Sequence, residues 1–111
     1  MSDDRGQFTD FEHAVAGVLE QLGEGDLMTY GEVAAEAGYP GAARAVGSFM
    51  RTKSGFSWWR IIAANGRLVP GMEREHARRL RAWLGFQILR FRNHFSSVFQ
   101  MLRVNFFYIK I

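Results

Sequence analysis

The 111-residue sequence predicts a mainly α-helical, winged-helix-like domain, built on a helix-turn-helix, with a short β-hairpin and an atypical C-terminal tail. Three features support this fold class. Two capping boxes open amphipathic stretches, a Gly/Pro turn separates two short helices, and an Asn-Gly pair lies between short apolar runs. Since 48% of the residues are hydrophobic, the chain can bury a core. We expect one domain over residues 1–84, followed by a tail over residues 85–111.

The first helix is expected over residues 10–22. Thr9 and Glu12 have the capping-box spacing, in which each side chain bonds to the other residue's backbone N–H. Apolar residues then recur every three or four positions, as a helix with one buried face requires: Phe11, Val15, Val18 and Leu22. Gly23 and Gly25 end this helix and begin a loop.

A second capping box, Thr29 and Glu32, opens a short helix that stops at Gly38. Pro40 precedes another helical run, over residues 41–51. The expected buried face of this second helix consists of Ala42, Ala45, Val46 and Phe49. Together the two helices and the turn form a helix-turn-helix, which presents its second helix to a DNA groove. Many helix pairs pack in this way without binding nucleic acid, so the pattern alone leaves both interpretations open.

The next region predicts a hairpin and a further helix. Asn65-Gly66 favours a tight hairpin turn, and the short apolar runs at residues 60–64 and 67–69 are its expected strands. A helix should follow over residues 72–84, because acidic residues lie in its first turn and arginines in its later turns, as the helix dipole favours.

The tail, residues 85–111, differs in character from the rest of the chain. It holds six of the ten phenylalanines, interleaved with basic residues. Up to Glu75 there are 7 basic and 11 acidic residues, a formal charge of −4, whereas the seven basic residues beyond it give +7. This polarity favours a polyanionic partner or, more simply, a solvated basic face. The tail is either an added amphipathic helix that binds DNA, a membrane surface or a protein, or the product of a changed reading frame near Trp83.

The composition also excludes several kinds of chemistry. The chain contains no cysteine, which removes disulfides, thiolate metal ligands and cysteine nucleophiles. His13, His76 and His94 do not show the spacing of metal ligands, so we expect neither a metal nor another cofactor. The N-terminus lacks the basic start and apolar run of a signal peptide, and no stretch of about 18 uncharged apolar residues occurs. We therefore expect a cytoplasmic protein, and a membrane partner is not favoured.

Two segments carry a resemblance to a known family. TYGEVAAEAGYPGAARAVGSFM, from Thr29, and SWWRIIAANGRLVPG, from Ser57, resemble the DNA-binding domain of O6-alkylguanine-DNA alkyltransferases. The resemblance covers residues 8–84 and is closest to the alkyltransferase-like branch, which lacks the reactive cysteine. Trp58 stands at the cysteine position and Trp59 at the histidine position. Because an indole nitrogen has no lone pair to accept an alkyl group, we expect no catalytic residue and no transferase activity.

The resemblance also implies roles for single residues. Arg44 matches the arginine finger that fills the gap left by an extruded base, and its alternative is a surface arginine paired with Glu36. Tyr30 matches the tyrosine that presses on the neighbouring phosphate. The other expected DNA contacts are Ala42, Ala43, Gly47, Ser48, Arg51 and Lys53. The expected alkylguanine pocket consists of Trp58, Trp59, Arg60, Val69, Pro70 and Gly71, with a phosphate contact as the alternative role of Arg60.

The function implied by the resemblance is recognition of DNA damage without repair. Such a protein binds O6-alkylguanine in double-stranded DNA by base flipping and signals to nucleotide excision repair proteins. The alternative is a small helix-turn-helix DNA-binding or transcription factor that flips no base. A third class is a surface-binding module that docks through its basic, aromatic tail.

Overall fold

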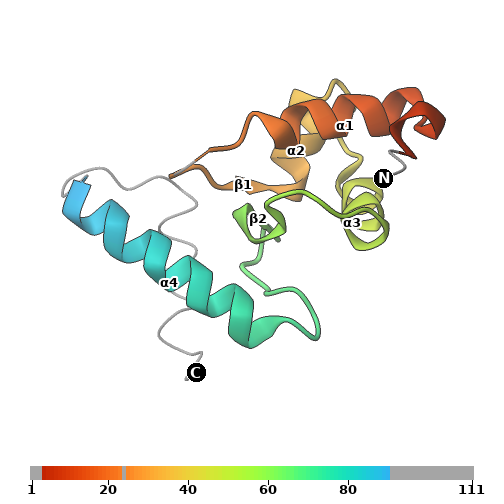
Figure 1. Ribbon diagram of the computed structural model, residues 1–111. Coiled ribbons are helices and arrows are strands. Elements are labelled where there is room, and N and C mark those ends of the chain that lie inside the picture. Colours follow the sequence, from red (N-terminus) through yellow and green to blue (C-terminus); the bar gives the residue numbers. More distant parts are fainter. Residues whose placement is uncertain (1–3, 24, 91–111) are drawn as a thin grey trace.

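The computed structural model describes residues 4–23 and 25–90, and Figure 1 shows their arrangement. The mainly helical fold class is confirmed: four α-helices and two short 3-10 helices surround a pair of two-residue strands. In chain order the elements are η1 (Asp4–Gln7), α1 (Asp10–Glu20), β1 (Met28–Thr29), α2 (Tyr30–Glu36), α3 (Ala43–Thr52), η2 (Trp58–Arg60), β2 (Ile61–Ile62) and α4 (Glu73–Arg90). The predicted tail lies outside the described residues from residue 91 onward.

Both predicted capping boxes form. In α1 the Thr9 hydroxyl accepts from the Glu12 backbone N–H at 3.2 Å, and the Glu12 carboxylate accepts from the Thr9 N–H at 2.9 Å. The corresponding bonds between Thr29 and Glu32 at the start of α2 are both 3.0 Å. Each box satisfies backbone donors that have no partner within the helix, so the first residue of each helix is fixed locally.

Gly38 ends α2 as predicted. Its φ of +92° lies in the left-handed region, which glycine adopts without strain. The N–H of Gly38 bonds to the Ala35 carbonyl at 3.0 Å, and the N–H of Tyr39 bonds to the Ala34 carbonyl at 2.8 Å. These are the two bonds of a Schellman motif, which turns the chain sharply toward α3.

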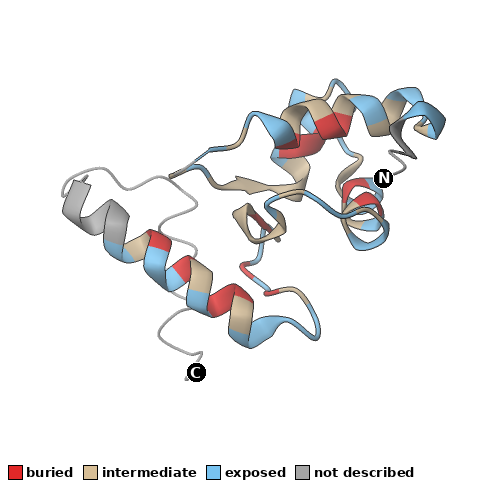
Figure 2. Ribbon diagram, viewed as in Figure 1, coloured by how far each residue is buried: buried red, intermediate tan, exposed pale blue. Residues whose placement is uncertain are grey.

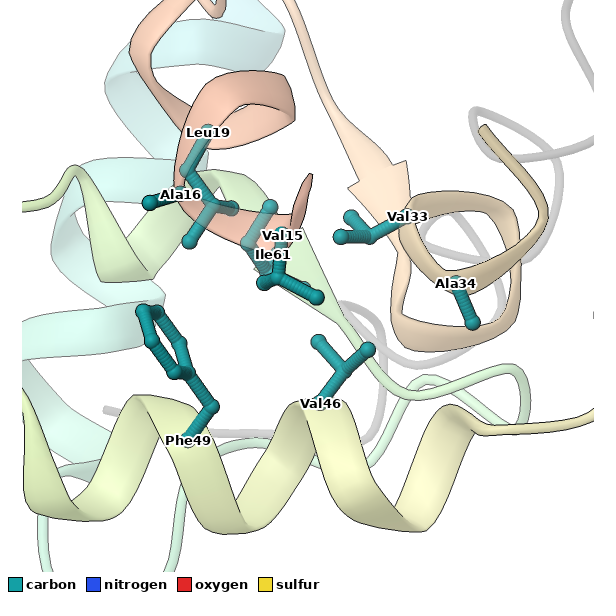
Figure 3. Close-up of a cluster of buried hydrophobic side chains, with 8 residues drawn as sticks. All are labelled: Val15, Ala16, Leu19, Val33, Ala34, Val46, Phe49 and Ile61. Carbon is teal, nitrogen blue, oxygen red and sulfur yellow. The ribbon is translucent and has the colours of Figure 1, made fainter. Parts of the chain in front are cut away.

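The first hydrophobic cluster lies between α1, α2 and α3. Figure 3 shows Val46 and Phe49 of α3 pointing toward the side chains of α1, with Val33 of α2 nearby. The buried members are Val15, Ala16, Leu19, Val33, Ala34, Val46, Phe49 and Ile61. The predicted placement of Ala45 on this face is wrong, because Ala45 is exposed. Ala42, Val46 and Phe49 already form a stripe at four and three residues, and Ala45 lies about 100° around the helix from Val46.

The predicted β-hairpin is also wrong. A turn forms at residues 63–66, since the Gly66 N–H bonds to the Ala63 carbonyl at 2.8 Å, but its central residues are Ala64 and Asn65 rather than Asn65 and Gly66. The strand that pairs with β2 is β1. The pairing is parallel, with Met28 opposite Ile61 and Thr29 opposite Ile62. Leu68, expected in the second strand, is instead buried against α4.

A second hydrophobic cluster anchors α4. Its buried members are Ile62, Leu68, Ala77, Leu80 and Trp83. The Trp83 indole N–H donates to the Gly25 carbonyl at 2.9 Å and so joins α4 to the loop before β1. In Figure 2 the buried residues of α4 alternate with exposed ones, as on an amphipathic helix that covers one side of the core. The helix runs six residues beyond the predicted end at residue 84, to Arg90.

Ion pairs form near the start of α4. The Glu75 Oε1 atom lies 2.7 Å from Nη2 of Arg78 and 2.7 Å from Nε of Arg79. Glu73 also lies in the first turn of this helix. The arginines hold the pKa of the Glu75 carboxyl at about 2, well below its ordinary value.

Among the residues that the structure describes, no helix is long and apolar enough to cross a membrane.

Truncation of the completely buried Ile61 to alanine should lower the free energy of unfolding by about 2–5 kcal/mol, because it leaves a cavity in the first cluster. Urea denaturation followed by circular dichroism measures this change. Met72→Ala is the matched control, since the Met72 side chain is 44% exposed and its truncation should cost little. Equal losses for the two variants would contradict the assigned position of β2 in the core.

Candidate nucleic-acid interface

The exposed face of α3 carries a line of polar and cationic side chains. Arg44, Ser48 and Arg51 are spaced by four and three residues and are all exposed, so they share the helix face opposite Val46 and Phe49. No ion pair joins Arg44 to Glu36 or to another acid in the described part of the chain. The alternative role of Arg44, a surface arginine that forms an ion pair with Glu36, therefore has no support from the structure.

Arg51 is held close along this face. Its guanidinium donates to the Ser48 hydroxyl at 3.0 Å. A Cβ atom built on Gly47 would lie 3.7 Å from the Arg51 Nη1 atom, so the guanidinium folds back over the glycine. Ala43 and Gly47 are half-buried and small, which leaves the backbone of α3 accessible between the longer side chains.

Tyr30 joins this surface from α2. It is the first residue of that helix and is half-buried. Burial raises the pKa of its hydroxyl above 10.0, and the positive charge of Arg51 acts in the opposite direction. The phenol is therefore a proton donor at neutral pH, and two of the predicted DNA contacts from separate helices lie near each other.

Lys53 turns toward α1. Its ammonium group lies 3.9 Å from the Glu12 carboxylate and 5.2 Å from the centre of the Phe8 ring. These contacts hold the end of α3 against α1. The backbone hydrogen bond from Thr9 and, to a smaller extent, the charge of Lys53 lower the pKa of Glu12. Lys53, which was predicted to contact DNA, therefore lies against α1 rather than beside Arg51.

The two tryptophans of η2 have different surroundings. The Trp58 ring lies edge-on against the His76 ring, with 5.1 Å between the centroids and 67° between the planes. Trp59 is covered by the guanidinium of Arg60, whose carbon lies 4.1 Å from the indole centroid. Arg60 also donates to the Asp26 carbonyl at 3.4 Å. Trp58 therefore lies against His76 of α4, whereas Trp59 and Arg60 pack on each other.

A cavity of about 370 Å³ opens on the α4 side of η2. It is lined by Gly25, Trp59, Arg60, Arg78, Arg79, Ala82 and Trp83. Trp59 and Arg60 are the predicted pocket residues that border it; Trp58, Val69, Pro70 and Gly71 are not among its walls. The contribution of α4, through Arg78, Arg79, Ala82 and Trp83, was not predicted from the sequence.

His76 is the second feature that the sequence reasoning missed. This side chain is completely buried, and its Nδ1 atom accepts from the Val69 N–H at 3.1 Å. Its Nε2 atom lies 3.1 Å from the Trp59 carbonyl, to which it donates in the neutral tautomer. Burial lowers the pKa of His76 below 6.5. No group of three potential metal ligands exists among the residues described, which include this histidine.

Comparison with known families now identifies the domain. Residues 10–85 match the family described as 6-O-methylguanine DNA methyltransferase, DNA binding domain. The chain belongs to this family. Its helix-turn-helix, the η2 tryptophans and most of α4 all lie within the matched region. Because the 111 residues contain no cysteine, this member has no thiolate to receive an alkyl group.

Individual relatives agree with this assignment. A protein named DNA base-flipping protein, from Vibrio parahaemolyticus serotype O3:K6 (strain AQ3810), is 39% identical over 57 residues. The matched part is 49% of this chain and 57% of the relative, so the chain spans little more than half of that protein.

Two solved structures share the fold. The structure of OGT from Mycobacterium tuberculosis gives a TM-score of 0.56 at 35% identity, over 70% of this chain and 48% of that one. The structure of S. pombe Atl1 in complex with damaged DNA containing O6-carboxymethylguanine also gives 0.56, at 28% identity, over 75% and 79% of the two chains.

Replacement of Arg51 by methionine should raise the pKa of Tyr30 further, because the guanidinium is the group that opposes the effect of burial. Ultraviolet titration of tyrosinate absorbance measures the shift, and Tyr30→Phe identifies which transition belongs to this residue. Arg44→Met, on the same helix face, is the control and should leave the titration of Tyr30 unchanged. A Tyr30 transition that ignores Arg51→Met would show that the two side chains do not interact.

Proposed function

We propose that this chain is a non-catalytic DNA-damage recognition protein, which binds O6-alkylguanine in duplex DNA by base flipping and signals to nucleotide excision repair. The observation that carries the proposal is the position of Arg44. It is exposed near the start of α3, on the face with Ser48 and Arg51, in a family member whose cysteine position holds Trp58.

Arg44 would occupy the space that a flipped nucleotide leaves. Extrusion of a base costs a few kcal/mol of stacking and pairing, and less when the base is already mispaired. A planar guanidinium can stack between the neighbouring bases and donate hydrogen bonds to them, which offsets part of that cost. The small residues Ala42, Ala43 and Gly47 present little bulk, so α3 can approach the DNA backbone closely.

Tyr30 and Arg51 would hold the phosphate beside the flipped nucleotide. A phenol that keeps its proton can donate to a phosphate oxygen, and an arginine adds a charge-assisted bond. Ser48 already orients the Arg51 guanidinium, so less conformational freedom is lost when the phosphate binds. Contacts of this type fix the position of the protein on the duplex without reading its sequence.

Trp58 would form the wall that receives the extruded base. Stacking of a base on an aromatic side chain contributes about 1–3 kcal/mol, and an apolar indole face also accommodates an added alkyl group. With no sulfur at this position, the alkyl group stays on guanine and the base is held rather than repaired. We propose that Val69, Pro70 and Gly71, which lie shortly before α4, complete this pocket.

The names of the relatives support base flipping as the binding mode. One is called a DNA base-flipping protein, and Atl1 has been crystallised with DNA that carries an alkylated guanine. A protein that binds a lesion without removing it needs another system to complete repair, and excision of the damaged nucleotides is the route that we propose. In Figure 1 α4 and α3 lie on different sides of β2, and no residue of α3 lines the cavity beside α4.

The domain boundary belongs to the same proposal. Residues 1–84 would form the DNA-binding domain, and residues 85–111 a separate tail. Because α4 continues to Arg90, the boundary falls inside a helix rather than in a linker. A protein cut at residue 84 would therefore lose the last turns of α4 together with the tail.

The chain should bind a duplex with one O6-methylguanine more tightly than the same duplex with guanine, and Arg44→Ala should reduce that preference about tenfold, since about 1.4 kcal/mol of gap-filling interaction is lost. Fluorescence anisotropy measures both affinities. Arg74→Ala, an exposed arginine on α4, is the control and should keep the preference.

Base flipping itself has a separate readout. A 2-aminopurine placed beside the lesion should become brighter when the neighbouring base leaves the stack, and Arg44→Ala should weaken this signal. Equal affinity for damaged and undamaged duplexes, without a change in fluorescence, would refute the proposal. A consensus sequence selected from random duplexes would instead favour a helix-turn-helix factor that flips no base.

A further inference from the structure

His76 connects three segments that are distant in the sequence. It lies in the first turns of α4 and is completely buried. One ring nitrogen bonds to Val69, in the segment before α4, and the other to Trp59 of η2. The His76 ring also packs against the Trp58 ring in a T-shaped arrangement. A single side chain thus contacts both tryptophans of η2 and the segment that ends in Pro70 and Gly71.

The two hydrogen bonds fix the protonation state of the imidazole. Nδ1 accepts from the Val69 N–H at 3.1 Å, so it carries a lone pair, and Nε2 carries the proton that it donates to the Trp59 carbonyl at 3.1 Å. A second proton would stand on Nδ1 and face the Val69 N–H, donor against donor. The connection therefore exists only in the neutral form.

We propose that His76 is a positioning residue for lesion recognition. Its imidazole holds Trp58 and residues 69–71 in fixed positions relative to each other. This inference rests on the proposed function, since it assumes that the flipped base lies between these two features. If the imidazole is lost, the Val69 N–H and the Trp59 carbonyl lose their partners, and the two sides of the pocket can move independently. Binding to the DNA backbone through α3 does not involve His76 and should persist.

Burial disfavours a positive charge on His76. It lowers the pKa of His76 below 6.5, and the hydrogen bond to the Trp59 carbonyl acts in the opposite direction with a smaller effect. The charged groups around it are Asp26 before β1, Arg60 of η2 and Arg67 of the connecting segment. On α4 itself they are Glu73, Arg74, Glu75, Arg78, Arg79 and Arg81. Glu75, the acid one residue away, is bonded to Arg78 and Arg79. Arg60 lies over Trp59 and adds further positive charge on that side.

Stability should therefore fall on acidification in a defined window. The unfolded chain takes up a proton at His76 near pH 6.5, whereas the folded chain does so only at lower pH. The free energy of unfolding is then independent of this group above 6.5, and it decreases as the pH drops from 6.5 to the pKa of the folded state. His76→Gln, which cannot take up this proton, should lose this pH dependence; denaturant unfolding at several pH values measures it.

The decisive experiment compares the affinity ratio for O6-methylguanine and guanine duplexes among four proteins: wild type, His76→Leu, His76→Gln and His13→Gln. His76→Leu keeps bulk but neither hydrogen bond, so the ratio should fall about tenfold while affinity for the guanine duplex is retained. The Gln amide can donate to Trp59 and accept from Val69, so His76→Gln should restore most of the ratio. His13 is exposed on α1, and its substitution should change nothing.

A measurement without DNA tests the role of His76 separately from the proposed function. Amide exchange of Val69, followed by NMR, should be slow in the wild type and His76→Gln and fast in His76→Leu, and the nitrogen shifts of His76 should show the Nε2–H tautomer. A folded His76→Leu that keeps the wild-type ratio, or a Val69 amide that exchanges equally fast in all variants, would overturn the role of His76 alone. Equal wild-type affinity for both duplexes would overturn the proposed function and the inference with it. If His76→Leu does not fold, the pH dependence of the wild-type ratio decides. A ratio that does not fall as the pH drops through the pKa of folded His76 overturns the inference, whereas a fall that is absent from His76→Gln supports it.

Discussion

The pairing of β1 with β2 is the constraint on which the rest of the structure depends. Successive residues of a strand point to opposite faces, and β2 uses this alternation to join two hydrophobic clusters. Ile61 belongs to the cluster of α1, α2 and α3, whereas Ile62 belongs to that of α4. Both side chains are almost completely buried, so two residues hold the helix-turn-helix and the last helix in one arrangement.

The same pairing positions the features proposed to bind DNA. Tyr30 follows β1 directly and η2 directly precedes β2, so in the parallel ladder the phenol lies at one end of the two-residue pairing and the two tryptophans at the other, beside the segment before β1. Packing of α3 on α2 then places Arg51 near Tyr30. Each side chain comes from a different element, yet only two backbone pairs and one hydrophobic cluster are needed to bring the elements together.

The absence of cysteine limits what binding energy can accomplish. In a transferase, stabilisation of the extruded base serves a bond-forming step, whereas under the proposed function the same interactions would only prolong the complex. A rigid pocket then matters more than a reactive one, because discrimination depends on how well the wall and the covering segment fit the lesion. The buried imidazole of His76 provides such rigidity without chemistry of its own, since both of its nitrogens are used in hydrogen bonds.

The sequence by itself determined the features that depend on near neighbours. Both capping boxes and the end of α2 at Gly38 involve groups within about five residues of each other, and all were predicted correctly. The family motifs also placed Arg44 and Tyr30 on helices at the surface. Only the tertiary structure decided the partner of β2, the separation of Trp58 from Trp59, and the role of His76. Each of these depends on contacts between segments far apart in the chain, where several partners compete and the burial of apolar surface, rather than local propensity, selects among them.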